Sequence, residues 1–259
     1  MIKGILDNKG TRLFIILAGF FITNALIAEV IGVKIFSLED TVGVPRANIM
    51  LFGNNFSFHL TAGVMLWPVV FVMTDIINEY YGPKAVRRIS YIAVALISYA
   101  FVMFYFAMGV PPADFWYGTG VADGIPDMSK AFNGVFGQGM WIIFGSLVAF
   151  LVSQVVDVTI FHKIKKVTGE KRIWLRATGS TLVSQLVDSF IVLFIAFKIG
   201  KGWSWQLVLA ICLVNYIYKF TMAILLTPLI YGVHRWIPKY VGIETSFKMK
   251  QVAMGKENE

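Results

Sequence analysis

The chain has 259 residues, of which 57% are hydrophobic and 15% charged, with a formal net charge of +8 and a mean hydropathy of +0.70. This composition lies outside that of soluble globular domains and predicts an integral membrane protein with no room for a soluble catalytic domain. The positive charge requires no nucleic-acid partner, because a basic cytoplasmic face against the anionic lipid bilayer accounts for it.

Six apolar stretches of helix length are expected, at residues 13–33, 57–77, 89–110, 139–161, 178–199 and 205–231. Each is close to the ~20 residues that cross a ~30 Å hydrocarbon core as a helix. A transmembrane β-barrel would instead show alternating segments of ~10 residues. The predicted fold is therefore an all-α integral membrane protein with six transmembrane helices, formed by residues 1–237.

Basic residues cluster at the N-terminus, in the 82–88 turn, in the 163–176 loop and near the C-terminus. Because Lys and Arg accumulate on cytoplasmic flanks, both termini are expected in the cytoplasm. The connections at 37–56 and 111–137 then face outward, where they either cap a site or simply join helices. Residues 238–259 are expected to form a polar, basic and disordered cytoplasmic tail.

Ionisable side chains in hydrocarbon cost about 2.5–3.5 kcal/mol on insertion scales, so each one needs a partner or a function. At the end of the second stretch, Asp75, Asn78 and Glu79 share one helix face through their i, i+3, i+4 spacing. For Glu79, a structural role beside the basic 82–88 turn stays open. Glu29 of the first stretch is expected at the outer interface, in contact with lipid headgroups.

The segment LVSQVVD, ending at Asp157, recurs as LVSQLVD, ending at Asp188. In each copy a glutamine, Gln154 or Gln185, precedes the aspartate by three residues on the same helix face. At ~1.5 Å per residue, the two aspartates lie at matched depths from opposite membrane edges. Antiparallel helices that carry the same motif at matched depths indicate inverted repeats around a midplane site. The alternative is interhelical hydrogen bonding alone, worth ~0.6 kcal/mol on average.

The sixth stretch adds Asn215 and Lys219 at i, i+4. Lys219 lies too deep to reach the interface and is expected to pair with a carboxylate, with or without ligand contact. A cavity of carboxylates, carboxamides and rings suits a polar heterocycle with adjacent N–H donors, such as the guanine edge. The single Cys212 and three scattered histidines indicate neither a disulfide nor a metal site, and no cofactor is expected.

Four ordered motifs, TDIINEYYGPKAVRR, SQVVDVTIFHKIKK, RIWLRATGSTLVSQLVDSFIVLFIAF and VNYIYKFTMAILLTPLIYG, resemble the queuosine precursor transporter family, also called the vitamin uptake transporter family, over about residues 15–235. The resemblance implies a bacterial inner-membrane importer with an S-component-like bundle. It implies uptake of 7-deazaguanines such as 7-cyano-7-deazaguanine for tRNA modification. The substrate site that it implies consists of Asp75, Asn78, Glu79, Gln154, Asp157, Gln185, Asp188, Asn215 and Lys219.

A secondary transporter is the leading hypothesis for the mechanism. The alternative is the substrate-binding component of an ATP-driven importer, whose ATPase would be a separate chain because this one has no Walker A motif. An intramembrane enzyme is not expected, since Asp157 and Asp188 differ in depth by ~9 Å on helical rise. Proton coupling and homo-oligomer formation both stay open at this stage.

Overall fold

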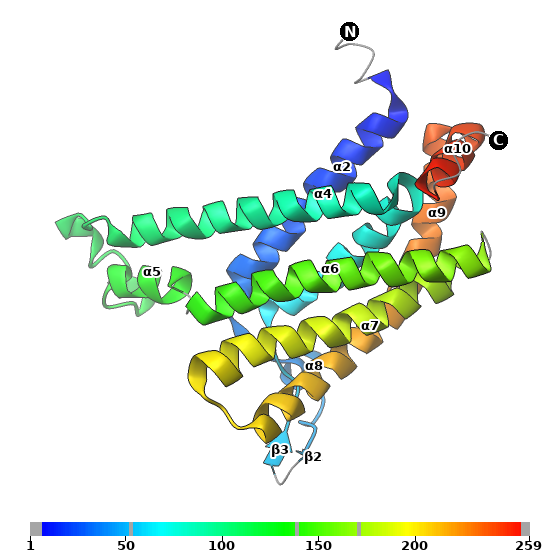
Figure 1. Ribbon diagram of the computed structural model, residues 1–259. Helices are drawn as coiled ribbons and strands as arrows, with labels where there is room; N and C mark the ends of the chain where they lie inside the picture. Colours follow the sequence, from blue (N-terminus) through cyan, green and yellow to red (C-terminus); the bar gives the residue numbers. More distant parts are fainter. Residues whose placement is uncertain (1–6, 52–53, 138–139, 170–171, 255–259) are drawn as a thin grey trace.

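The computed structural model describes residues 7–51, 54–137, 140–169 and 172–254. Long helices pack on one another, and short strand pairs and turns connect them (Figure 1). The helices are α2 (Lys9–Ile31), α3 (Leu38–Val42), α4 (Trp67–Gly109), α5 (Met128–Phe136), α6 (Met140–Thr168), α7 (Ile173–Leu193), α8 (Trp205–Leu225), α9 (Thr227–Val241) and α10 (Ile243–Ala253). The strands are β1 (Ile35–Ser37), β2 (Ile49–Leu51), β3 (Asn54–Phe56) and β4 (His59–Thr61). Short helical segments are η1 (Ala62–Met65), η2 (Asp114–Trp116), η3 (Val121–Asp123) and the π-helical η4 (Phe194–Ile199).

Five helical segments of the described chain are long and apolar enough to cross a membrane: Lys9–Ile31, Ala62–Gly109, Ile142–Thr168, Trp174–Ile199 and Trp205–Val241. The count differs from the six stretches expected, because those at 57–77 and 89–110 fall largely in the single helix α4. The start of the first of them is strand β4 rather than helix.

Helix α4 consists of two arms joined at a sharp kink. Gly82 has φ 80° and ψ 174°, which no helix contains. Glycine accepts this positive φ, and the following Pro83 has no N–H to continue the hydrogen-bond ladder. The chain reverses direction at this point (Figure 1).

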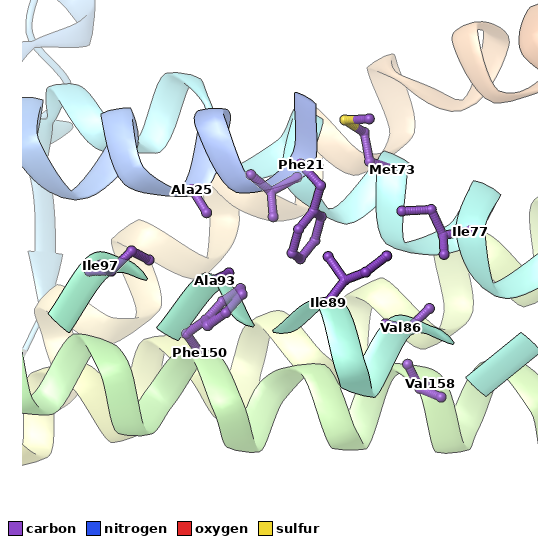
Figure 2. Packing of buried hydrophobic residues seen from close by; sticks show 11 residues of the cluster. Phe21, Ala25, Met73, Ile77, Val86, Ile89, Ala93, Ile97, Phe150 and Val158 are labelled. Carbon is purple, nitrogen blue, oxygen red and sulfur yellow. The ribbon is translucent and has the colours of Figure 1, made fainter. Parts of the chain in front are cut away.

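The two arms of α4 pack against α2 and α6 in one hydrophobic cluster (Figure 2). Phe21 of α2 is 1% exposed, and its ring lies 6.2 Å from that of Phe150 on α6. The cluster takes residues from both arms, namely Val70, Met73 and Ile77 from the first and Val86, Ile89, Ala93 and Ile97 from the second. Burial of this apolar surface, at ~25 cal/mol per Å², holds the arms together.

Helices α6 and α7 make the most extensive contact in the fold. Gly145 allows their close approach: a Cβ there would lie 3.2 Å from the Ile195 side chain and 3.3 Å from the Val192 carbonyl oxygen. Small residues serve the same purpose at helix interfaces in membranes generally. The pairing brings the two copies of the Ser-Gln-x-x-Asp motif face to face.

The connection from α2 to α4 is an ordered cap rather than a simple linker. Strand β1 pairs antiparallel with β4, and β2 pairs antiparallel with β3. The longer connection after α4 also carries structure, in η2, η3 and α5. The sequence left open whether this connection caps a site or simply joins helices. Because it folds into paired strands that cover part of the molecule, the first interpretation applies to the α2–α4 connection.

The expectation of a disordered tail after residue 237 is wrong for residues up to Ala253. Helix α9 continues to Val241, and α10 packs back on the kink of α4. A Cβ on Gly82 would lie 3.2 Å from the Ala253 carbonyl oxygen, so α10 sits directly against the kink. Although its sequence is polar, α10 is held in place because Ser246 and Ala253 are buried. Residues 255–259 lie outside the described residues.

Candidate functional site

A cavity of about 750 Å³ lies between α2, α6, α7, α8 and the strands of the α2–α4 connection. Its charged and most of its polar lining residues are Glu29, Ser57, His59, Thr61, Ser146, Asp188, Ser189, Lys201, Asn215 and Lys219. Its aromatic lining residues are Phe56, Trp67, Phe197 and Trp203. Small-molecule sites have this size and this mixture of apolar walls with a few convergent polar groups.

An ion pair between α7 and α8 forms part of the cavity wall. Asp188 Oδ2 lies 2.5 Å from Lys219 Nζ, with side-chain exposures of 18% and 8%. Ser153 of α6 donates a longer hydrogen bond, 3.4 Å, to Asp188 Oδ1. The predicted pairing of Lys219 with a carboxylate is thereby confirmed. A ligand in the cavity meets a carboxylate acceptor and an ammonium donor side by side.

Glu29 also belongs to the cavity, which corrects the expectation of a headgroup contact. It is only 7% exposed, and the Ser146 hydroxyl of α6 donates a hydrogen bond to its Oε1. A residue near the end of α2 was expected at the interface, but the strands β1 and β4 extend the protein beyond it. The cavity therefore holds two carboxylates, from α2 and α7.

The aromatic wall comes from η4, which directly follows α7, and from the loop after it. The Phe197 and Trp203 rings stack with centroids 4.4 Å apart, and Lys201 Nζ lies 5.2 Å from the Phe197 ring. Phe197 lies in the π-helical segment η4, whose wider turns shift side chains relative to an α-helix. Such segments are frequent at functional sites. Flat ring faces suit stacking with a planar ligand.

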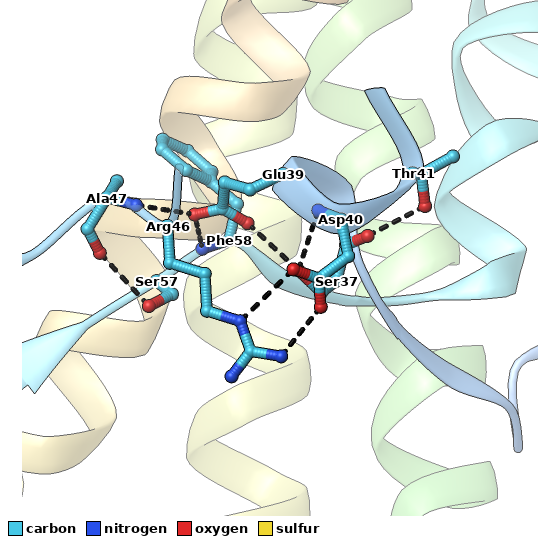
Figure 3. A network of polar contacts seen from close by, with 8 residues as sticks. All are labelled: Ser37, Glu39, Asp40, Thr41, Arg46, Ala47, Ser57 and Phe58. Carbon is cyan, nitrogen blue, oxygen red and sulfur yellow. Dashed lines mark hydrogen bonds and ion pairs between the residues drawn. The ribbon is translucent and has the colours of Figure 1, made fainter. Parts of the chain in front are cut away.

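Glu39 anchors the cap over the cavity (Figure 3). Its Oε1 accepts hydrogen bonds from the backbone N–H of Phe58, at 2.8 Å, and of Ala47, at 3.2 Å. Burial raises the pKa of Glu39, but these hydrogen bonds to the charged form outweigh it, so the pKa lies below its usual value. Arg46 adds a two-point contact to Asp40, at 3.2 and 2.7 Å.

The two motif copies are joined by reciprocal hydrogen bonds. Ser153 of the first copy donates to Asp188 of the second, and Ser184 of the second donates to Asp157 of the first at 3.0 Å. Antiparallel helices related by a two-fold axis produce this exchange, in agreement with the predicted inverted arrangement. The environments of the aspartates nevertheless differ, because Asp188 lines the cavity while Asp157 is fully buried.

Glu79 lies in a cluster of cations near the α4 kink. Its carboxylate is 2.8 Å from Arg176, 3.0 Å from Lys165 and 3.7 Å from Lys250 of α10. Glu79, Lys165 and Arg176 are each at most 1% exposed. Arg176 also donates to the Gly169 carbonyl oxygen at 2.6 Å. The structural role left open for Glu79 is thus present, though its partners are not those of the 82–88 turn.

Between the cavity and this cluster lies a layer of buried polar groups. Thr74 donates to Gln154 Oε1 at 3.1 Å, and His162 Nε2 lies 2.9 Å from Asn78 Oδ1. Within the described residues, four buried atoms in this layer have no hydrogen-bond partner: Asp75 Oδ1, Asn78 Nδ2, Gln154 Nε2 and Gln185 Oε1. Buried polar groups are normally paired, so this layer is where a small bound species or a rearrangement is expected.

The structure thus separates the nine predicted site residues into two sets. Asp188, Asn215 and Lys219 line the cavity. The other six, Asp75, Asn78, Glu79, Gln154, Asp157 and Gln185, are buried and do not line it. The described residues contain no group of three or more His, Cys, Asp or Glu that could hold a metal.

Several important residues were not predicted. Ser146 lies outside the four quoted motifs, whereas Lys165 and Arg176 lie inside two of them but were assigned to a cytoplasmic loop. Helical spacing offered no signal either, because at about 100° per residue Arg176 lies about 180° around α7 from Gln185 and about 120° from Asp188.

Comparison with known proteins places the chain in a family. Residues 61–233 match the family described as "Putative vitamin uptake transporter". The chain belongs to this family. It is 31% identical over 187 residues to the "Probable queuosine precursor transporter" of Bacillus subtilis, covering 71% of this chain and 75% of that one. It is 29% identical over 180 residues to the "Queuosine precursor transporter" of Escherichia coli, covering 68% and 73%. No solved structure matches the chain.

Family membership and the apolar helices together make this a multi-pass protein of the bacterial inner membrane. The match begins at Thr61 and ends at Val233, so it leaves out α2, most of the cap and α10. Asp188, Asn215 and Lys219 lie inside it, whereas Glu29 lies outside.

Proposed function

We propose that the chain imports a queuosine precursor, a 7-deazaguanine such as 7-cyano-7-deazaguanine, as a secondary transporter that serves tRNA modification. The observation that supports this is the Asp188–Lys219 pair on the wall of a large cavity in a membrane-spanning fold. The names of the two relatives supply the class of substrate.

The ion pair is complementary to the hydrogen-bonding edge of this substrate class. A guanine edge carries a carbonyl acceptor next to two N–H donors. In the proposed complex the Lys219 ammonium donates to the carbonyl oxygen, and the Asp188 carboxylate accepts from the adjacent N–H groups. Charge-assisted bonds of this kind are about twice as strong as neutral ones. Asn215, one turn before Lys219 on α8, supplies an amide next to them, and the Phe197–Trp203 wall stacks on the ring.

The arms of α4 are proposed to cross the membrane separately, which gives six crossings with both termini in the cytoplasm. The reversal at Gly82 supports this, as do the three basic residues Lys84, Arg87 and Arg88 directly after it. The α4 kink, the end of α6, the start of α7 and α10 lie at one end of the long helices, and α5 at the other (Figure 1). In this orientation the cavity takes substrate from the outside.

The test is uptake of labelled 7-cyano-7-deazaguanine into proteoliposomes that contain only this protein. Wild type is expected to transport it, and Asp188→Asn and Lys219→Met are expected to fail. Each variant loses a charge-assisted hydrogen bond, worth about 1.5–3 kcal/mol, which weakens binding by about tenfold or more. Asp123→Asn, which removes an exposed carboxylate outside the cavity, is the matched control and retains full uptake.

The outcomes separate the proposals. Normal uptake by both cavity variants would overturn the assigned site, and the absence of binding and transport by wild type would overturn the substrate. Binding without flux, together with co-purification of an ATPase, would instead favour the substrate-binding component of an ATP-driven importer. Mass measurement of the purified protein in detergent distinguishes a monomer from a homo-oligomer.

A further inference from the structure

A second, much smaller void lies beneath the cavity. Its volume is about 20 Å³, and Asp75, Thr178, Thr181, Gln185 and Lys219 supply its polar lining. A void needs only about 10–15 Å³ to hold one water molecule, provided that two to four polar groups surround it. Lys219 lines both the void and the large cavity, so this residue separates the two, with its ammonium group bound to Asp188 on the cavity wall.

Asp75 is the carboxyl group in the lining of this void. It is 2% exposed, its Oδ1 has no hydrogen-bond partner, and no ion pair joins it to Lys or Arg within the described residues. An ionised carboxylate buried without a partner costs several kcal/mol. In the arrangement seen here, with Lys219 bound to Asp188, Asp75 is therefore expected to carry a proton.

The charged neighbours of Asp75 leave Lys219 as its available cation. Lys165 and Arg176 already form ion pairs with Glu79 of α4. Asp157 of α6 adds negative charge near Asp75. The start of α9 faces the void with apolar side chains, Ile230 in the helix and Leu226 just before it. A metal cation is disfavoured in the void, because Lys219 is one of its lining residues and its positive charge would repel a second cation.

We propose that Asp75 is the proton-binding residue that couples transport to a proton gradient. The proton passes from a hydronium ion in the cavity, past the Asp188–Lys219 pair and through one water in the void, to a carboxylate oxygen of Asp75. It leaves to water on the other side after the helices rearrange. No other bond forms or breaks. This inference rests on the proposed substrate site and adds the ion that drives it.

Competition for Lys219 provides the coupling. When Asp75 is protonated, Lys219 pairs with Asp188, and together they form the donor–acceptor surface that the substrate recognises. When Asp75 loses its proton, Lys219 is drawn across the void toward the new charge, and that surface is lost. Proton and substrate therefore favour one another's binding, and the coupling is reciprocal.

The experiment compares wild type with Asp75→Asn, which imitates the protonated acid in shape and charge. In proteoliposomes, Asp75→Asn is expected to keep exchange of labelled for unlabelled 7-cyano-7-deazaguanine. Its accumulation under an inward proton gradient falls to the level without a gradient. Wild-type affinity is expected to drop by about tenfold per pH unit above the titration of Asp75, as one linked proton requires, whereas the affinity of Asp75→Asn stays constant with pH.

A measurement without substrate makes the inference independent of the proposed function. The infrared spectrum of wild type is expected to contain a protonated carboxylic acid band that Asp75→Asn lacks and Asp123→Asn retains. If wild type transports nothing but this band is present, the substrate assignment fails and the proton site stands. Gradient-driven accumulation by Asp75→Asn, loss of its exchange activity while it remains folded, or an unchanged infrared spectrum would each overturn the proposal.

Discussion

The two ends of the helix bundle carry similar charged residues in different surroundings. At the cavity end, Asp188 has one cation, Lys219, and both line a space of about 750 Å³. At the other end, Glu79 is surrounded by Lys165, Arg176 and Lys250 and is 0% exposed. A carboxylate with one cationic partner and open space beside it can still accept hydrogen bonds from a ligand. A carboxylate with three cationic partners has its oxygens occupied by protein side chains.

This difference agrees with what alternating access requires of a transporter. A midplane site must be open to one side and closed to the other at any moment. The Glu79 cluster joins the first arm of α4 to α6, α7 and α10, and under the proposed function it would close the end opposite the cavity. The reciprocal bonds of Ser153 and Ser184 lie between the two ends, where they hold α6 against α7.

Replacing Glu79 tests the closed end and has the largest expected effect on stability. Glu79→Gln removes the carboxylate charge that pairs with the buried Arg176 and Lys165, and breaking a buried ion pair in this way costs about 3–5 kcal/mol. Thermal unfolding in detergent measures it. Glu244→Gln is the control, because its partner Lys248 and Glu244 itself are exposed at 71% and 82%. Equal stability of the two variants would show that the cluster does not hold this end together.

The serines of the repeat test whether its two copies are equivalent. Ser184→Ala removes a 3.0 Å bond to the fully buried Asp157, and a buried acceptor left unpaired costs about 1–3 kcal/mol. Ser153→Ala is expected to cost less, because its bond is 3.4 Å long and Asp188 keeps Lys219. Unfolding in detergent measures both variants. A larger loss from Ser153→Ala would contradict the assigned asymmetry.

Lys250 tests how much α10 adds to the closure. It lies 3.7 Å from Glu79, is 15% exposed and stands 5.4 Å from the Tyr80 ring. Lys250→Met is expected to cost about 1 kcal/mol or less, as a partly solvated pair does. Arg176→Met, which removes a fully buried partner, is expected to cost about 3–5 kcal/mol. Comparable unfolding temperatures of these two variants would show that α10 is as important as the buried cations.

Much of this arrangement could be predicted from patterns within single helices. Apolar length indicated the membrane-spanning helices, although the expected number was six and five are found in the described chain. The repeated motif indicated antiparallel α6 and α7, and the depth of Lys219 predicted its carboxylate partner. Contacts between distant segments could not be predicted in this way. The pairing of Glu79 with Arg176 depends on how α4 packs against α7, and Glu29 faces the cavity only because the α2–α4 connection folds into strands. The helical structure of residues 238–253 was not predicted, because a polar composition gives no sign of the few buried side chains that pack α10 against α4.

Glu39 gives the smallest effect, confined to the cap, and its pH dependence has a definite sign. The folded-state pKa of Glu39 lies below its value in an unfolded chain, because backbone N–H groups bind the charged form. Its contribution to the cap is therefore complete above the unfolded pKa, about 4.3, and is lost as pH falls through the lower folded pKa.

Hydrogen exchange at the Ala47 and Phe58 amides follows the opening of the cap directly, after correction for the intrinsic pH dependence of exchange. Wild type is expected to protect these amides at neutral pH and to lose protection in acid, while Glu39→Gln shows weak protection throughout. Retained protection in acid would mean that the strands alone hold the cap, and that the cavity end is as firmly built as the end closed by Glu79.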